Sequence, residues 1–191
     1  MSASTETSLK RALFWVATTT AVYLLMNGAQ LFETSLIVPA RTAAPPASLG
    51  MFQGEYRLDF KNFWIAFHSI HEVTFILAII FAWPIRSVRY WLLALFVVHF
   101  AVRAWTLAYF APTIIGFQSI PPSPSIDPAL VESAARWRSL NIVRVALFMA
   151  VNFAMFPLII RIANRLCSVQ PPGRLQPVVR PAAERLDRDR V

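Results

Sequence analysis

The chain has 191 residues, of which 57% are apolar and 15% charged, with a formal net charge of +8. This composition excludes a disordered protein and an ordinary cytosolic one, and the length is that of a single domain. The arginines flank apolar runs, which favours a membrane surface over nucleic acid as the basic residues' partner. With Cys167 as the one cysteine, an internal disulfide and a CxxC thiol relay are also excluded.

Four apolar runs are long enough to cross a bilayer as helices. They cover residues 11–32, 62–83, 88–111 and 141–162. The first run is interpreted as a retained anchor, because no small-residue cleavage site follows it directly. The sequence thus predicts an all-α integral membrane four-helix bundle in one domain, residues 1–167. The Pro- and Arg-rich segment 168–191 is predicted to be a disordered tail.

The connections between the runs differ in length. Pro84 ends the second run and predicts a tight turn to the third. The connections 33–61 and 112–140 are long, and Asp127 followed by Pro128 predicts a helix N-terminus that continues into the fourth run. Basic residues gather at one end of the predicted bundle, which places both termini in the cytoplasm, at the inner membrane if the source is bacterial. They are Lys10, Arg11, Arg86, Arg89, Arg161, Arg165 and Arg174.

Ionisable and amide side chains inside the runs indicate a site, because each is costly in lipid unless it has a partner. Helical spacing places each set on one face, in the half of the bundle nearer the long connections. The sets are Tyr23, Asn27, Gln30 and Thr34; His68, His71 and Glu72; His99 and Arg103; and Trp137, Asn141, Arg144, Phe148 and Asn152, and Glu33 lies in the same half. These faces must turn inward. We therefore expect a polar cavity in the outer half of the bilayer.

Structural roles compete with this interpretation. The amides of Asn27, Gln30 and Asn141 are suited to hydrogen bonds between helices. Glu33 fits an exposed helix end, Arg144 can extend to the outer headgroups, and Glu72 can form a buried ion pair with Arg103 or Arg144.

Two kinds of chemistry fit the ionisable set. A mononuclear iron, copper or zinc site would draw on His68, His71, Glu72, His99 and Glu33. The acids are too few for a carboxylate-bridged pair of metals, and the spacing is not that of His-Glu-x-x-His. Metal-free chemistry needs only a desolvated histidine as base, Glu72 to orient it and a guanidinium to stabilise negative charge.

Short motifs in this sequence resemble a four-span membrane family that includes the anthrone oxygenases. They are Gly28-x-x-Leu31-Phe32, Val38-Pro39, Pro45-Pro46 and Trp137-x-x-x-Asn141-x-x-Arg144, and the similarity covers roughly residues 12–160. It implies oxidation of an anthrone-type carbon to a quinone by O₂ without an evident cofactor, and it implies that the last motif lines the site. His68, His71 and Glu72 lie outside the family's pattern.

The resulting hypothesis is a membrane oxidoreductase, oxygenase-like and without a cofactor, that acts on a small lipophilic molecule. His71 or His68 removes a proton, Glu72 orients the base, and Arg103 and Arg144 stabilise the enolate. The substrate is held by Asn27, Gln30, Trp137, Asn141 and His99. The alternatives are a metal-dependent oxidoreductase, a ring isomerase and a non-catalytic binding or transport subunit. The expected partners are membrane lipid and the lipophilic ligand, without nucleic acid, and a homo-oligomer is compatible with the sequence.

Overall fold

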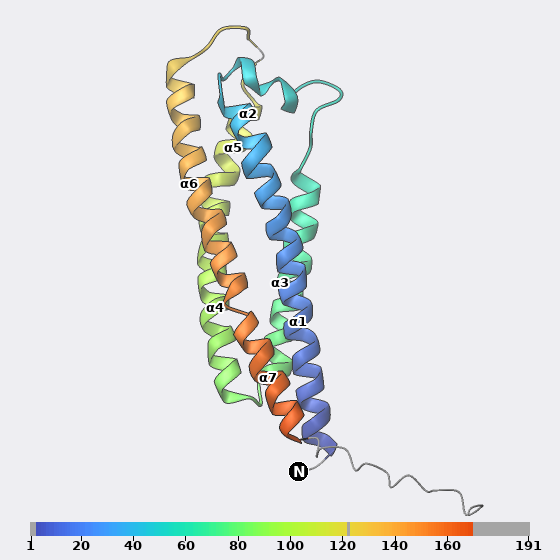
Figure 1. Cartoon of the computed structure of the whole chain (residues 1–191). Helices are drawn as coiled ribbons and strands as arrows, with labels where there is room; N and C mark the ends of the chain where they lie inside the picture. Colours follow the sequence, from blue (N-terminus) through green and yellow to red (C-terminus); the bar gives the residue numbers. More distant parts are fainter. Residues whose placement is uncertain (1–2, 122, 170–191) are drawn as a thin grey trace, which may run out of the picture.

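The described part of the chain is built from helices. A computed structural model describes residues 3–121 and 123–169. It contains four helices that are long and apolar enough to cross a membrane, as the sequence predicts (Figure 1). They cover Ser4–Thr42, Lys61–Ala82, Arg86–Gln118 and Pro128–Ser168. Three of them are longer than the apolar runs, because they continue into the segments expected to be connections.

Two of the long helices consist of consecutive elements. The first comprises α1 (Ala3–Phe32), the π-helical turn η1 (Glu33–Ile37) and α2 (Val38–Thr42), and the third comprises α4 (Arg86–Trp105), the π-helical turn η3 (Thr106–Phe110) and α5 (Ala111–Gln118). The second is α3 (Lys61–Ala82), and the fourth is α6 (Pro128–Phe153) followed by α7 (Phe156–Val169). A short 3₁₀ helix, η2 (Ala47–Phe52), lies between α2 and α3.

Each π-helical turn precedes a proline by two residues. The N–H of Val38 bonds to the carbonyl of Glu33 before Pro39, and the N–H of Ala111 bonds to the carbonyl of Thr106 before Pro112. A proline inside a helix lacks an N–H and its ring displaces the carbonyl four residues earlier. A single wider turn absorbs that displacement without ending the helix.

The chain runs up and down between two ends of the bundle (Figure 1). The start of α1, the α3–α4 turn and the end of α7 lie at one end, called here the turn end. The opposite, loop end carries η2 and the connection from α5 to α6. The two connections are joined there: the N–H of Asp127 lies 3.0 Å from the carbonyl oxygen of Pro45, and Gln53 donates from Nε2 to the carbonyl of Ile120 at 2.6 Å.

The predicted N-terminus of the last long helix is confirmed. Asp127 Oδ1 accepts from the N–H groups of Ala129, at 2.9 Å, and Leu130, at 3.4 Å. Pro128 occupies the first helical position, where its missing N–H leaves no donor unsatisfied. The helix α6 therefore begins at the loop end, well before the apolar run at 141–162.

The bundle places polar side chains inside and apolar ones outside. On α3, His68, His71 and Thr74 are buried while Ile70 and Val73 are exposed. This distribution is the one that suits a lipid surrounding, in which polar groups find partners only between helices. An apolar core fills the turn end. A second apolar cluster lies at the loop end and comprises Val38, Leu49, Phe110, Phe117, Ala134 and Trp137.

The tail predicted as disordered, residues 168–191, falls outside the described residues except for its first two. Those two, Ser168 and Val169, are the last residues of α7.

Candidate functional site

Five polar side chains from three helices meet inside the bundle. We call them the histidine layer: Tyr23 of α1, His68, His71 and Glu72 of α3, and His99 of α4. The spacing of i, i+3 and i+4 brings the three α3 residues to one helix face. Tyr23, His71 and His99 have no solvent-exposed surface (0%). The bundle thus brings Glu72, His71 and His99, which come from two helices, close together.

Glu72, His99 and Tyr23 form a hydrogen-bonded chain. Glu72 Oε1 lies 3.0 Å from His99 Nε2, and His99 Nδ1 lies 2.9 Å from the Tyr23 hydroxyl. An ionised carboxylate only accepts, so in the neutral imidazole Nε2 donates to Glu72 and Nδ1 accepts from Tyr23. The carboxylate thereby fixes the orientation and the tautomer of His99, as the orienting acid does in a catalytic triad.

His71 lies against this chain with both ring nitrogens free. Its ring centroid is 4.1 Å from that of Tyr23 and 4.7 Å from that of His99, yet neither nitrogen has a hydrogen-bond partner. His68 Nδ1 is also buried and unpartnered. Buried imidazole nitrogens are normally paired. A ligand group that accepts or donates a hydrogen bond would therefore supply the partner that these ring nitrogens lack.

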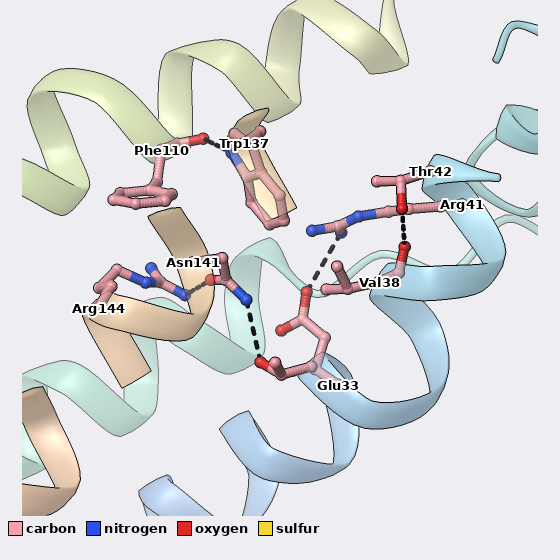
Figure 2. A network of polar contacts seen from close by, with 9 residues as sticks. Glu33, Val38, Arg41, Thr42, Phe110, Trp137, Asn141 and Arg144 are labelled. Atoms are coloured by element: carbon pink, nitrogen blue, oxygen red, sulfur yellow. Dashed lines mark hydrogen bonds and ion pairs between the residues drawn. The ribbon is translucent and has the colours of Figure 1, made fainter. Parts of the chain in front are cut away.

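A second polar cluster lies nearer the loop end, and we call it the arginine layer (Figure 2). It comprises Glu33, Thr34, Arg41, Trp137, Asn141 and Arg144. Asn141 joins two helices, because its Nδ2 donates to Thr34 Oγ1 at 3.0 Å while its Oδ1 accepts from Arg144 Nη2 at 2.7 Å. Glu33 Oε1 lies 3.3 Å from Arg41 Nη1.

Two aromatic rings support the guanidinium groups of this layer. Arg41 Cζ lies 4.3 Å from the ring centroid of Trp137, and Arg144 Cζ lies 4.7 Å from that of Phe110. Trp137 in turn donates from Nε1 to the carbonyl of Phe110 at 3.3 Å. Planar guanidinium groups bind well to aromatic faces, which hold them in a fixed orientation.

The two layers are adjacent along α6. Phe148 lies beside the histidine layer, with its ring centroid 5.4 Å from that of His99. At about 1.5 Å per residue, Arg144 is roughly 6 Å and Trp137 roughly 16 Å from Phe148 towards the loop end. Between the layers on α1 lie Asn27 and Gln30, both buried and each with a side-chain oxygen that lacks a partner.

Three structural alternatives from the sequence are corrected by these contacts. Within residues 3–121 and 123–169, the carboxylate of Glu72 is hydrogen-bonded to His99, rather than paired with Arg103 or Arg144. Arg144 points into the bundle instead of extending to headgroups (Figure 2). Glu33 is half-buried within the π-helical turn η1 and is not at an exposed helix end. Arg103 is half-buried on α4, one turn from His99 towards the loop end.

Of the five residues considered as metal ligands, four lie in the histidine layer and one, Glu33, does not. Glu33 belongs to the arginine layer, about three helical turns from Tyr23 on the same helix. In the described part of the chain, no group of three or more His, Cys, Asp or Glu side chains has an arrangement that could hold a metal ion.

Two hollows in the described structure lie away from the histidine layer. A groove of about 540 Å³ runs along α7 and is lined by Pro157, Ile160, Arg161, Asn164, Arg165 and Ser168. A cavity of about 200 Å³ at the loop end is lined by Pro46, Ala47, Gly50, Gln53, Ser123 and Pro124.

Three residues of these layers, Tyr23, Thr34 and Arg41, are not among the site residues predicted from the sequence. Tyr23 shares a helix face with Asn27 and Gln30, but a tyrosine on such a face is usually only packed there. Arg41 was assigned to a connecting loop, although it is only 3% exposed. The available signal was its spacing of eight residues from Glu33, which equals one α-helical turn plus one wider π-helical turn.

Comparisons of the chain with protein-family models, with curated proteins and with solved structures each give no match.

Proposed function

We propose that this protein is an integral membrane enzyme that removes a proton from an activated carbon of a small lipophilic substrate and oxidises that carbon with O₂. The observation that carries the proposal is the hydrogen-bonded chain of Glu72, His99 and Tyr23 beside the unpartnered His71. A half-buried carboxylate and a fixed imidazole next to a free imidazole are the components of general base catalysis.

His71 is the base in this proposal. Its nitrogens are free, and the carboxylate of Glu72, acting through His99, places negative charge close to the imidazolium that forms when His71 accepts the proton. The substrate is left as an enolate. Arg103 and Arg144, which lie towards the loop end from the histidine layer, supply the positive charge that stabilises it.

The oxidation step follows from the resemblance to the family that includes the anthrone oxygenases. For an anthrone-type substrate, the ring CH₂ and O₂ give a quinone carbonyl and water, so no further reductant is needed. The motif that carries the resemblance, Trp137, Asn141 and Arg144, is joined into one layer by the contacts described above. This arrangement supports a role for the motif in holding the oxygen substituents of the substrate.

The test is oxygen uptake and quinone formation with anthrone as the probe, using the full chain in lipid nanodiscs and correcting for empty nanodiscs. His71→Gln, His99→Gln and Glu72→Gln should each lower turnover at least about a hundredfold, the range expected for loss of a general base or its orienting group. Ser69→Ala is the matched control, because Ser69 lies on the same helix and is exposed. Near-normal turnover in all three variants would remove this mechanism.

Other outcomes would identify the rival functions. Rearrangement of an unsaturated ring without oxygen uptake would indicate an isomerase. Tight binding without any product would indicate a binding or transport subunit. Stoichiometric iron, copper or zinc in active preparations, lost together with activity in His99→Gln, would indicate a metal-dependent enzyme.

A further inference from the structure

The arginine layer carries more positive than negative charge. Arg41 and Arg144 contribute two guanidinium groups, while Glu33 is the carboxylate in contact with this layer. Arg41 is only 3% exposed, and a buried charge is costly unless it has a partner. The arginine layer therefore holds one positive charge that no carboxylate of the layer balances.

Hydrogen-bond donors of the same groups are also unused. Arg41 Nε and Nη2 and Arg144 Nε are buried and have no partner. The contact between Arg41 Nη1 and Glu33 is 3.3 Å long, whereas charge-assisted hydrogen bonds of this type are usually about 2.7–2.9 Å. An anion that binds here would therefore find unpaired N–H donors on Arg41 and Arg144. It would compete for Arg41 with Glu33, whose contact with that guanidinium is long.

We propose that the arginine layer binds the carboxylate of a lipophilic aromatic acid, with Arg41 as the principal contact. This proposal rests on the proposed function, because it names the chemical class of the substrate of the proposed enzyme. A guanidinium presents a planar set of donors that matches a carboxylate. Trp137 and Phe110 already hold the two guanidinium groups by their faces, so little side-chain freedom is lost when the anion binds.

The separation of the two layers along the bundle determines the length of the ligand. Arg41 stacks on Trp137, and Trp137 is roughly 16 Å along α6 from Phe148 beside the histidine layer. A flat molecule of about three fused rings with a carboxylate at one end spans most of this separation. The acid approaches from the loop end. There the ring centroid of Phe52 lies 5.5 Å from Arg41 Cζ, and Gln53, the residue after Phe52, lines the cavity of about 200 Å³.

The test compares two fluorescent probes of the same shape, anthracene-2-carboxylic acid and its neutral carboxamide. Each is titrated against the full chain in phosphatidylcholine nanodiscs, with empty nanodiscs subtracted. The acid should bind at least about tenfold more tightly than the amide. Arg41→Gln should remove this preference, while Arg161→Gln, an exposed arginine near the turn end, should leave it unchanged.

Glu33→Gln provides a second, independent outcome. Because it removes the competing carboxylate and keeps the side-chain shape, it should strengthen binding of the acid by about tenfold and leave the amide unaffected. Loss of a merely structural contact would not raise affinity for one probe alone. Equal binding of acid and amide to the wild type, or unchanged acid binding in Glu33→Gln, would overturn the proposal even if Arg41→Gln failed to fold.

The two proposals fail separately. Acid binding that depends on Arg41, in a protein that does not oxidise anthrone, would keep the carboxylate site and remove the oxidase function. Oxidation of anthrone with no preference for the acid would remove the carboxylate site alone.

Discussion

Tyr23 is the residue through which the histidine layer is joined to α1. Its hydroxyl donates to His99 Nδ1, and its ring lies against that of His71. A phenol buried in an apolar bundle could have been a packing residue. Because it contacts both imidazoles, it is placed to set the position of each.

Tyr23→Phe tests this role because it removes only the hydroxyl group. The variant keeps the ring and leaves His99 Nδ1 unpaired, which should cost about 1–3 kcal/mol of stability. If Tyr23 positions the base, kcat with anthrone should fall about tenfold or more while KM changes little. Oxygen-uptake kinetics and thermal unfolding in detergent check the two effects. A variant that is less stable but has wild-type kcat would show that the hydroxyl is only structural.

Single residues also show where sequence reasoning reaches its limit. The spacing of His68, His71 and Glu72 is sufficient to predict a shared face, since helix geometry alone decides it. Which histidine Glu72 contacts is not decidable in this way, because it depends on the rotation of α4 about its own axis. That rotation brings His99 to Glu72 and leaves His71 free, so the residue assigned to substrate binding is the one that the carboxylate orients.

At the scale of elements, apolar length predicts the four helices but not their ends. The first apolar run stops at Phe32, where Glu33 and then Pro39 indicate the end of a helix. In the structure the helix continues to Thr42 through the π-helical turn η1. The extra residue of that turn rotates the rest of the helix and brings Arg41 back to the side of Glu33. Local hydropathy contains no signal for this wider turn.

Asp127 is an element-scale feature that the sequence does specify, and it supports a stability prediction. Asp127→Ala removes the acceptor for two N–H groups at the start of α6 and should lower the free energy of unfolding by about 1 kcal/mol. Asp127→Asn keeps an acceptor and should remain within a few tenths of the wild type. Unfolding in mixed micelles, followed by helical circular dichroism, measures both. Equal destabilisation by Asn and Ala would contradict a capping role.

At the scale of the whole molecule, the bundle separates two kinds of interior. The turn end is filled by an apolar core, while the histidine and arginine layers lie towards the loop end. The exterior is apolar around both, with Leu25, Val73 and Phe100 among its exposed residues. A protein arranged in this way keeps its polar groups apart from lipid.

The side of the membrane that this end faces can be tested with the native cysteine. The basic residues at the turn end predict that this end is cytoplasmic. Cys167 lies there and is exposed, so a membrane-impermeant maleimide should label it in lysed spheroplasts but not in intact ones. Tyr56, 92% exposed in the connection at the loop end, gives the matched probe as Tyr56→Cys in a Cys167→Ser background, which should be labelled in intact spheroplasts. The reverse pattern would turn both polar layers towards the cytoplasm, and the substrate would then have to reach them from that side.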